Sequence, residues 1–424
     1  MRILFVTQWF DPEPTFKGLA FARELTRLGH QVQVLTGFPN YPGGSVYPGY
    51  RVRLLQRQQI DGIDIVRVPL YPSHSRSSVG RIANYLSFAA AAALIGPMFV
   101  TRPDVIYAYH PPATVGLPAL LLRLIFRARL VYDIQDMWPD TVAATGMVRG
   151  AWMIRLLSAW CGFIYRHADH LTVLSPGFKR TLIHRGVPAE KISVIYNWCD
   201  EAQIARGRGI SDAGVLPEWA DKFLVIFAGT MGDAQGLDSV LDAAELVARR
   251  RPDVHFLFIG GGTEVLRLTR EVAARQLSNV SFAARVPVGS IGPILARADA
   301  LLVHLKDDPL FRITIPSKTQ AYMVAGRPIL MAVGGDAEAV IRQANCGIAC
   351  EPENPGQLAD AVETLSAMNA DERQVLGDNG RRFYDSKFSL TAGTKRFESA
   401  FKEDHKPECE RDSFVDGRYR PSSS

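Results

Sequence analysis

Short apolar runs alternate with longer helix-like stretches along most of this chain, and the alternation occurs in two separate blocks. Such runs are typical of buried strands, and their alternation with helices favours a parallel sheet covered on both faces. The predicted strands of the first block are Ile3–Thr7, Gln31–Thr36, Ile63–Pro69, Val105–Tyr109, Leu130–Asp133, Leu171–Leu174 and Ile192–Tyr196. Those of the second block are Phe223–Ala228, His255–Ile259, Val280–Ala283, Ala300–Val303, Ile329–Ala332 and Gly347–Ala349. The sequence therefore predicts an α/β fold of two tandem Rossmann-like domains whose parallel sheets face a central cleft.

Helix-like stretches separate these strands. The predicted helices include Gly18–Leu28, Arg81–Phe99, Ala151–His167, Leu237–Arg249, Glu264–Gln276, Lys318–Ala325 and Ala337–Ala344. We expect a first domain over residues 1–196, a linker over 197–222 and a second domain over 223–385. A helix over 386–402 is expected to return to the first domain, and residues 403–424 are expected to form a disordered tail.

Basic residues are concentrated in the first half of the chain. Residues 1–200 carry 21 Lys and Arg against 12 Asp and Glu, whereas the remainder carries 27 against 31. This asymmetry indicates that the first half faces an anionic partner, such as a membrane surface or a lipid diphosphate. A nucleic acid partner is not expected, because the chain has no base-reading motif and no stripe of interleaved basic and aromatic residues.

Two apolar segments of the first half bear on membrane association. Leu86–Val100 is too short to span a bilayer, so it fits a buried helix or a helix partly embedded in the membrane interface. Leu120–Arg129 carries three arginines among apolar residues, which fits either a membrane-surface segment or a core helix with a solvated basic edge. The N-terminal run is not typical of a signal peptide, and five scattered cysteines favour reduced thiols in the cytoplasm.

Two glycine-rich loops follow predicted strands of the second block, where ligands of α/β sheets bind. The first contains Gly229, Thr230, Met231 and Gly232, and the second contains Gly261 between two further glycines. Strand-to-helix loops of this kind bring backbone N–H groups and a helix dipole close to a phosphate. The first loop is therefore predicted to bind an anionic ligand, whereas the second fits a simple turn equally well.

A short helix is predicted between two prolines near residue 320, with Ser317 as its N-cap and Gly326 just beyond its C-terminus. Lys318 then lies in the first turn, where its positive charge opposes the helix dipole unless an anion lies nearby. A diphosphate would supply that anion, although a solvated lysine is the alternative. Lys318 and the adjacent Thr319 and Gln320 are the predicted contacts.

Polar residues also follow predicted strands of the first block. Asp136 and His110 are candidates for proton transfer, each with a structural or exposed loop side chain as the alternative. Lys17 lies beside Gly18 in the loop after the first strand, where it could meet a donor or acceptor phosphate. Asn197 lies at the domain junction, where a purely structural role is the alternative. We group Lys17, Gly18 and Asn197 as predicted acceptor-side residues.

The order of these motifs resembles the GT-B-fold glycosyltransferases of family 4, and the resemblance covers the chain to about residue 402. It is carried by Arg27–Thr36, Val131–Pro139, Ile195–Asp200, the Gly229 loop and Lys318–Pro328. Two segments, Phe38–Pro42 and Gln135–Asp140, are similar to the fucosamine-transferase-like branch, which builds O-antigen, capsule or exopolysaccharide repeat units in bacteria.

This resemblance implies a retaining transferase that moves a sugar, expected to be an N-acetylated amino sugar, from a UDP-sugar to a polyprenyl-diphosphate-linked saccharide. It implies a peripheral protein at the cytoplasmic face of the cell membrane. No cofactor and no metal are expected, since the UDP-sugar is a substrate. Lys318 is expected to stabilise the leaving diphosphate, and Arg285 and Val286 are expected to join the donor site.

Two departures from the family pattern alter the expected donor contacts. Ile313 and Ala321 stand where many members carry a Glu-x7-Glu pair, so Gln320 or a backbone group is expected to hold the ribose. Thr230 and Gln235 stand where many members carry the Arg and Lys that clamp the phosphates. The remaining candidates for positive charge are Lys318, Arg285 and Arg312.

Three other functions remain open from the sequence. A UDP-sugar 2-epimerase of the same fold would need acidic and His residues clustered for proton abstraction, and pairs such as Asp307-Asp308 do not form such a set. A non-catalytic nucleotide-sugar-binding subunit would explain the missing Glu pair. A transferase with a soluble acceptor would leave the basic first half without a partner.

Overall fold

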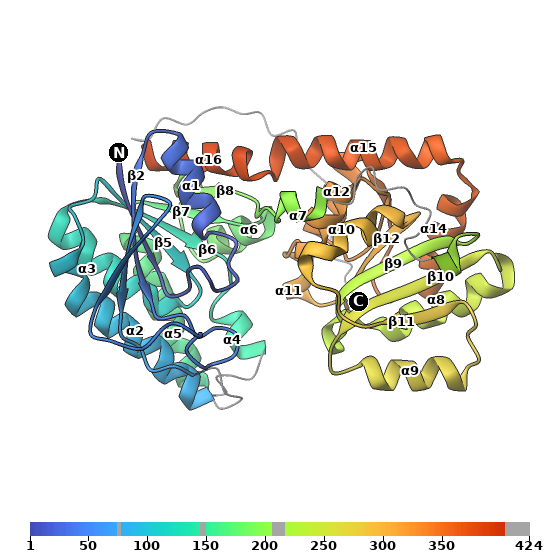
Figure 1. The fold of residues 1–424 in the computed structure, drawn as a ribbon, viewed down its shortest axis with the longest axis horizontal. Helices are drawn as coiled ribbons and strands as arrows, with labels where there is room; N and C mark the ends of the chain where they lie inside the picture. The colour runs from blue at the N-terminus through green and yellow to red at the C-terminus, as the bar shows by residue number, and fades with distance from the viewer. Residues whose placement is uncertain (74–77, 145–149, 206–216, 403–424) are drawn as a thin grey trace, which may run out of the picture.

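Two α/β domains make up the computed structural model, which describes residues 1–73, 78–144, 150–205 and 217–402. Figure 1 shows the domains side by side, with the last two helices running along the top of both. The predicted tail and residues 206–216 of the predicted linker lie outside the described residues.

The first sheet is parallel apart from its first edge strand. Its order is β3-β4-β2-β1-β5-β6-β7-β8, and β3 pairs antiparallel with β4. The strands are β1 (Arg2–Thr7), β2 (Gln31–Gly37), β3 (Gln56–Ile60), β4 (Ile63–Val68), β5 (Val105–His110), β6 (Arg129–Ile134), β7 (His170–Val173) and β8 (Ile192–Val194). The strand β3 was not predicted because four of its five residues are polar, as an exposed edge allows.

The second sheet is parallel throughout, in the order β11-β10-β9-β12-β13-β14. Its strands are β9 (Phe223–Thr230), β10 (Val254–Gly261), β11 (Val280–Ala283), β12 (Ala300–His304), β13 (Ile329–Ala332) and β14 (Gly347–Ala349). Both sheets match the predicted architecture, and the α/β fold of two Rossmann-like domains is confirmed.

Helices connect the strands and cover both faces of each sheet. In the first part of the chain they are α1 (Leu19–Arg27), α2 (Ser78–Phe99), α3 (Gly116–Phe126), α4 (Asp140–Ala144), α5 (Ala151–His167), α6 (Pro176–His184) and α7 (Glu201–Ala205). In the second they are α8 (Leu237–Arg250), α9 (Val265–Ala274), α10 (Val288–Arg297), α11 (Pro309–Arg312), α12 (Ser317–Ala325), α13 (Asp336–Ala344), α14 (Pro355–Ala367), α15 (Ala370–Lys387) and α16 (Leu390–Lys402).

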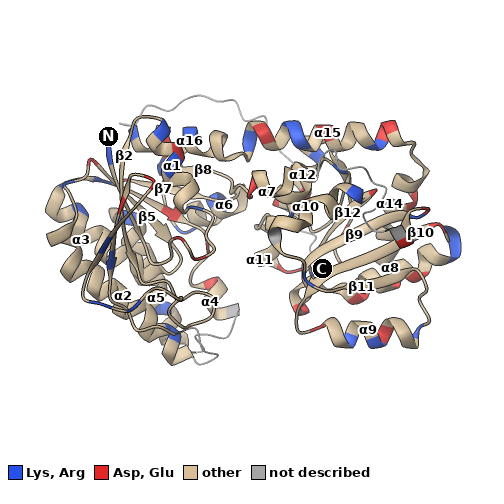
Figure 2. Ribbon diagram, viewed as in Figure 1, with Lys and Arg blue, Asp and Glu red and all other residues tan. Residues whose placement is uncertain are grey.

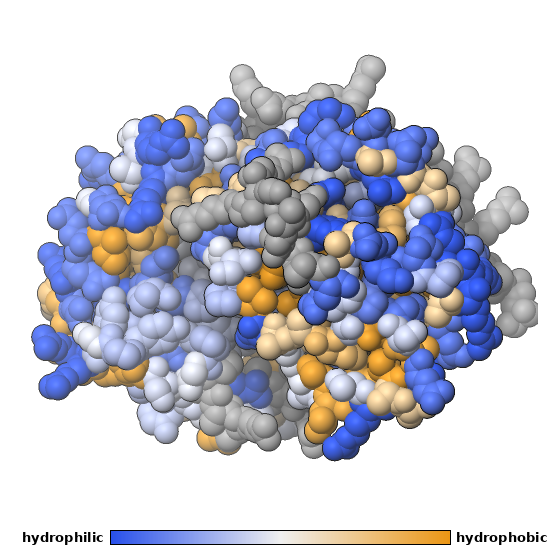
Figure 3. Space-filling model, turned by 45° about the vertical axis from the view of Figure 1, so that its right-hand side comes forward, coloured by the Kyte–Doolittle hydropathy of each residue, from blue (hydrophilic) through white to orange (hydrophobic). Residues whose placement is uncertain are grey.

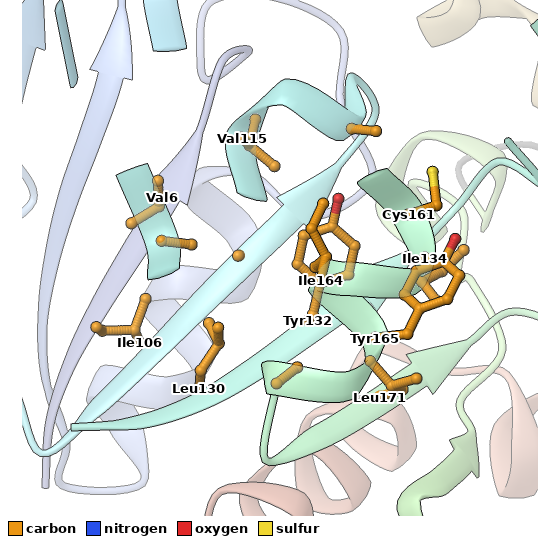
Figure 4. Close-up of a cluster of buried hydrophobic side chains, with 14 of the residues drawn as sticks. Val6, Ile106, Val115, Leu130, Tyr132, Ile134, Cys161, Ile164, Tyr165 and Leu171 are labelled. Atoms are coloured by element: carbon orange, nitrogen blue, oxygen red, sulfur yellow. The ribbon is translucent and has the colours of Figure 1, made fainter. Parts of the chain in front are cut away.

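Helices α2, α3 and α5 cover one face of the first sheet. Val6 and Leu130 of the sheet pack there against Ile164 of α5. Figure 4 shows this cluster, in which Tyr132 of β6 lies near Tyr165 of α5. The cluster is almost fully buried, so the hydrophobic effect fixes these helices to the sheet.

The opposite face of the first sheet is covered by α1 and by the C-terminal helix α16. Phe21 of α1 and Phe397 of α16 lie 5.0 Å apart between ring centroids. Both rings pack against Tyr107 of β5. The chain therefore builds its second domain after β8 and then returns to the first domain through α16.

Two helical layers likewise enclose the second sheet. Helices α8 and α14 pack on one face through residues such as Val240 and Val362. Helices α12, α13 and α15 pack on the other through Met323, Ile341 and Tyr384. The carboxyl ends of the parallel strands are left to the connecting loops, where ligands of such folds bind.

Helix α2 begins earlier than the apolar stretch that predicted it. It starts at Ser78 and runs for 22 residues, so it is long and apolar enough to cross a membrane by length and composition. The prediction that this segment is too short to span is therefore wrong. The predicted helix Arg81–Phe99 began three residues late, and Asn84 within it is buried and accepts a hydrogen bond from Gln8.

A buried ion pair joins the first sheet to the segment that leaves it. The Nζ atom of Lys17 lies 3.6 Å from a carboxylate oxygen of Asp133, and both side chains are fully buried. Lys17 also donates to Oδ1 of Asn197 at 2.6 Å and lies over the rings of Trp198 and Phe397. This network ties the loop after β1 to the end of β6, the domain crossing and α16.

Removing the lysine from this pair should destabilise the protein markedly. We expect Lys17→Met to lower the free energy of unfolding by about 3 kcal/mol, because it leaves the Asp133 carboxylate buried and unpaired. Urea unfolding followed by circular dichroism measures the loss, with Lys395→Met on the exposed side of α16 as the control.

Adding Asp133→Asn to Lys17→Met should recover part of that loss, since the unpaired charge is then gone. Fully additive losses in the double variant would contradict an ion pair at this position.

Candidate active site

The ends of β9 and β10 approach one another through glycines. A Cβ atom at Gly260 would lie 1.9 Å from the carbonyl oxygen of Gly229, and one at Gly262 would lie 2.1 Å from that of Met231. Gly229 and Gly260 have φ angles of 141° and 150°, which side chains rarely allow. Gly260 and Gly262 therefore allow close packing of the second loop against the first, whereas a Cβ atom at Gly261 would meet nothing within 4 Å, so ligand contact by Gly261 stays a prediction.

Much of the first loop's hydrogen-bonding capacity is used inside the protein. The N–H of Met231 donates to the carbonyl of Gly261 at 2.9 Å, and its side chain is buried in the core. The N–H of Gly232 donates to Oε1 of Gln235 at 2.8 Å. The prediction that Met231 contacts a ligand is therefore wrong, whereas Thr230 is exposed at the strand end.

Lys318 lies against this loop, and no carboxylate of the described residues pairs with it. A Cβ atom at Gly229 would come 2.8 Å from Cε of Lys318, so glycine makes room for the side chain. The Nζ atom is buried, has no hydrogen-bond partner among the described residues, and lies 3.2 Å from the ring centroid of Phe227. Burial lowers the pKa of Lys318 to about 7. Such a position favours a bound anion, which would restore the charged form.

The helix that carries Lys318 begins without a side-chain cap. Pro316 occupies the N-cap, so the predicted cap Ser317 is instead the first helical residue. The predicted C-terminal end of this helix is confirmed, since Gly326 is the C-cap of α12 and adopts the left-handed conformation. The hydroxyl of Thr319 is also buried without a partner among the described residues. An uncapped N-terminus beside two unpartnered polar side chains is well suited to a phosphate.

Gln320 is occupied by the start of the same helix. With its amide nitrogen turned toward the first turn, it donates to the carbonyls of Pro316 at 2.9 Å and Ser317 at 3.0 Å. Its side chain is only 3% exposed. These bonds leave Gln320 little capacity to hold the ribose, so a backbone group, the other contact predicted there, becomes the expected one.

The two candidate arginines differ in availability. Nε of Arg312 lies 2.7 Å from a carboxylate oxygen of Asp307, so its charge is already neutralised. Arg285 is exposed in the loop after β11, and the neighbouring Val286 packs partly buried against the second-domain core. Arg285 is thus the stronger candidate for a phosphate. No group of His, Cys, Asp and Glu that could hold a metal ion occurs in the described part of the chain.

In the first domain, His110 is the last residue of β5, and its imidazole ring is buried. Both of its ring nitrogens are buried and have no hydrogen-bond partner among the residues that the structure describes. Burial lowers the pKa of His110 to about 3, so the ring stays neutral. Because a general acid or base works best with a pKa near the working pH, proton transfer by His110 is disfavoured. A neutral imidazole can still donate to one ligand hydroxyl and accept from another.

Asp136 lies just beyond β6 within a group of aromatic rings. Burial raises the pKa of Asp136 to about 6. Burial, and then the neighbouring Asp136 carboxylate, raises the pKa of Tyr41. Burial also raises the pKa of Tyr85, with smaller contributions from Arg81, which lowers it, and from Tyr41 and Asp136, which raise it, so both tyrosines lie near Asp136. Trp9 stacks on Tyr41 with 4.5 Å between ring centroids. We call Trp9, Tyr41, Tyr85 and Asp136 the aromatic–acid cluster.

These four residues could not be grouped from the sequence alone, because they come from three loops and a helix. A signal was present, since Trp9 and Tyr41 each follow a strand of the first sheet at its carboxyl end. Aromatic rings there offer flat apolar surfaces beside a hydrogen-bonding carboxylate, an arrangement suited to an amphipathic ligand.

The predicted acceptor-side residues have structural roles instead. Lys17 and Asn197 are bonded to each other within the buried network described above. A Cβ atom at Gly18 would lie 2.2 Å from a carboxylate oxygen of Asp11, which accepts from the N–H of Leu19 at 2.6 Å and so caps α1. The structure therefore contradicts ligand contact by Lys17, and it gives Gly18 and Asn197 packing and bridging roles.

The sequence also missed the contact between the two domains. Asp336, at the start of α13, accepts from the N–H of Gly177 and from Arg180, whose nitrogen lies at 2.6 Å. Ser175 donates to the carbonyl of Ile313 at 2.5 Å, and the Ile313 side chain packs against the first-domain core. The position where many family members carry a Glu is thus used here to join the domains, close in sequence to Lys318.

Comparisons with known proteins show the class to which this chain belongs. Residues 19–198 match the family described as a glycosyl transferase 4-like domain, and residues 222–368 match glycosyl transferases group 1. The chain is 28% identical over 287 residues to WbjE of Pseudomonas aeruginosa, which carries the name of a glycosyltransferase; the match covers 66% of this chain and 71% of WbjE. It is 27% identical over 394 residues to WcaI of Escherichia coli, which carries the name of a colanic acid biosynthesis glycosyl transferase, covering 89% and 92%.

Solved structures share the fold. Anabaena HepE in complex with UDP superposes with a TM-score of 0.66 at 17% identity, covering 94% of this chain and 99% of HepE. A trehalose-6-phosphate protein from E. coli bound with UDP-2-fluoro glucose gives a TM-score of 0.73 at 12% identity, covering 95% and 99%. The two family matches span both domains, and the chain belongs to the GT-B-fold glycosyltransferases of family 4.

The unpaired lysine should cost stability in the ligand-free protein. We expect Lys318→Met to raise the free energy of unfolding by roughly 1–2 kcal/mol, because an apolar side chain fills the site without a buried charge. Urea unfolding measures the gain, and glycosyl transfer should be lost in the same variant. Lys306→Met, which removes an exposed lysine paired with Asp233, is the control and should not stabilise.

The gain in stability from Lys318→Met should decrease as the pH rises. Because the pKa of Lys318 is about 7 when folded and 10.5 ordinarily, the folded protein binds fewer protons between these values, and its stability rises with pH there. The advantage of Lys318→Met should therefore be largest below pH 7 and shrink toward pH 10. An advantage that stays constant over this range would contradict an unpaired buried ammonium.

Proposed function

We propose that this glycosyltransferase takes its sugar from a UDP-sugar and transfers it to a saccharide carried on a polyprenyl diphosphate, in bacterial polysaccharide biosynthesis. The observation that carries the proposal is the buried ammonium of Lys318, which has no hydrogen-bond partner among the described residues and lies at the start of α12, where no side chain of the described chain caps the helix. A diphosphate supplies the anion that this position lacks.

The chemistry that this site would assist is departure of a nucleoside diphosphate. As the bond between the sugar and the diphosphate breaks, negative charge grows on the phosphate oxygens. Lys318 and the hydroxyl of Thr319 would donate to those oxygens, and one preorganised donor of this kind is worth about 3 kcal/mol of barrier. Arg285 and the exposed Thr230 would complete the donor contacts.

We assign the acceptor to the aromatic–acid cluster of the first domain. The rings of Trp9 and Tyr41 would pack against the apolar face of a sugar, and the Asp136 carboxylate would accept a hydrogen bond from the attacking hydroxyl. His110 would hydrogen-bond a sugar hydroxyl as a neutral ring. This division gives each domain one substrate.

The proposed course retains the anomeric configuration. The acceptor oxygen bonds to the anomeric carbon on the face from which UDP departs, and the departing phosphate takes the hydroxyl proton. Asp136 then orients the acceptor hydroxyl and does not have to keep its proton. No metal or other cofactor has a part in this scheme.

Relatives support the donor and the pathway. HepE was solved with UDP and with UDP-glucose, and WcaI carries the name of a colanic acid biosynthesis enzyme. The similarity of residues 38–42 and 135–140 to the fucosamine-transferase-like branch supports an N-acetylated amino sugar as the group transferred. The basic first half supports an anionic lipid acceptor reached by a peripheral protein at the cytoplasmic membrane face.

Labelled transfer tests the proposal. Purified protein is incubated with a panel of radiolabelled UDP-sugars and a bacterial lipid extract, and the label on lipid is counted with and without EDTA. We expect label from one UDP-amino sugar on lipid, surviving EDTA, and released by mild acid as a lipid diphosphate would be. The Lys318→Met variant should transfer at least about a hundredfold more slowly.

Two outcomes would overturn the proposal. Conversion of the UDP-sugar to a free epimer without any acceptor would indicate the isomerase of the same fold. Label on a water-soluble saccharide, with none on lipid, would remove the lipid acceptor while leaving the transferase.

The assignment of Asp136 to the acceptor predicts that kcat/KM decreases on the acid side of its pH profile. Because Asp136 has a raised pKa of about 6, the carboxylate is lost as pH falls through that value. We expect kcat/KM to fall below about pH 6 in the wild type and to be about a hundredfold lower, without that limb, in Asp136→Asn. Asp140→Asn, which alters a nearby carboxylate paired with Arg185, is the control. An unchanged limb in Asp136→Asn would contradict the assignment.

A further inference from the structure

Exposed apolar side chains gather on one outer layer of the first domain. The described part of the chain exposes nineteen large apolar side chains, and eleven of them lie on α2, α3 and α5. They are Val79, Ile82, Leu86, Leu94, Met98, Leu117, Leu124, Ile125, Trp152, Leu156 and Phe163. The second domain exposes two, Leu266 and Val375, and the right-hand edge of Figure 3, on that domain's side, is largely hydrophilic.

These three helices form one continuous layer. Helix α3 packs against both α2 and α5, and the inner sides of all three are buried in the core of the first sheet. On α2 the exposed residues Leu86, Leu94 and Met98 recur at multiples of four, so they line one outward stripe. Leu94, Met98 and Leu124 are each 75% exposed, which is unusual for side chains of this size.

The charge of this layer has one sign. The sequences of α2, α3 and α5 contain no Asp and no Glu, and they contain Arg81, Arg123, Arg155 and Arg166. Arg123 is already paired with Asp169, whose carboxylate oxygen lies 2.6 Å away, whereas Arg155 and Arg166 are exposed. Figure 2 shows blue without red on these helices, whereas α9 and α15 carry both colours. The layer therefore combines apolar side chains with arginines, the composition of surfaces that bind anionic lipid.

We propose that the outer face of α2, α3 and α5 is a membrane-binding surface, which lies on an anionic bilayer and inserts its apolar side chains below the headgroups. The exposed Arg155 and Arg166 pair with lipid phosphates. This inference deepens the proposed function, which already carries the acceptor on a lipid, and its test requires no sugar donor.

The same surface fits other occupants poorly. Two copies of this chain joined face to face would oppose arginines with no carboxylate on these helices to pair them. Helix α2 is long enough to cross a membrane, yet its inner side holds Tyr85 and Phe88 in the first-domain core. Crossing would expose that core, so α2 is expected to lie along the membrane surface.

The orientation also suits the aromatic–acid cluster. Helices α2, α3 and α5 follow parallel strands, so their N-terminal ends lie toward the carboxyl edge of the first sheet. Tyr85 on the inner side of α2 belongs to the cluster, while Ile82 and Leu86 on the same helix face outward. A saccharide on a membrane-anchored diphosphate would thus reach the cluster from the edge of the bound surface.

Vesicle flotation tests the inference. The full chain is mixed with phosphatidylcholine vesicles, with or without phosphatidylglycerol, and floated through a density gradient. We expect the wild type to float with the anionic vesicles, and the triple variant Leu94→Glu, Met98→Glu, Leu124→Glu to lose at least about tenfold in partitioning. The matched control Leu266→Glu, Val375→Glu changes the exposed apolar residues of the second domain and should float like the wild type.

The following outcomes would contradict a membrane-binding surface on α2, α3 and α5. Equal flotation of the triple variant and the wild type, or loss in the control alone, would place lipid binding elsewhere. A wild type that floats with neither vesicle but is dimeric by light scattering, with a monomeric triple variant, would show that a second copy covers the face. Retention of the wild type in membranes after alkaline carbonate extraction would show that α2 spans the bilayer. Circular dichroism and unchanged UDP binding establish that the variants are folded.

Discussion

The buried ion pair of Lys17 and Asp133 fixes the first domain in the arrangement on which the rest of the structure depends. Asp133 accepts from Tyr107 of β5 and Thr172 of β7, so one carboxylate joins three neighbouring strands at their carboxyl ends. Lys17 carries the network to the domain crossing and, through the ring of Phe397, to α16. The chain that leaves the first sheet and the helix that returns to it are thus fixed at the same point.

Lys17 and Lys318 both bury their ammonium groups, and we assign the first to structure and the second to a ligand. Lys17 has its anion within the protein, whereas Lys318 lies over Phe227 without one among the described residues. An uncompensated buried charge is costly, so its presence beside an uncapped helix and a glycine strand end indicates a site that is completed by a substrate. We assign Lys318, whose charge has no partner among the described residues, to donor binding.

Apolar patterning made the sheets predictable, and the bounds of β11 and β13 agree with the predicted strands residue for residue. The directions in which individual side chains point were harder to predict. Lys17 and Met231 both lie in loops of the predicted kind, but one points into an ion pair and the other into the core. Their partners come from distant segments, which a single sequence does not pair. The aromatic–acid cluster and the exposed face of α2, α3 and α5 likewise depend on elements that meet only in the fold.

Calorimetric binding of a UDP-sugar tests most directly whether Lys318 receives the diphosphate. The diphosphate of a UDP-sugar does not titrate near neutrality, so proton exchange on binding reports on the protein. With a pKa of about 7 in the free protein, Lys318 should take up a proton as the anion binds, and the observed enthalpy at pH 8 should vary with the ionisation enthalpy of the buffer. We predict net proton uptake in the wild type and none in Lys318→Met. Binding without proton uptake, or with equal uptake in both proteins, would contradict the account.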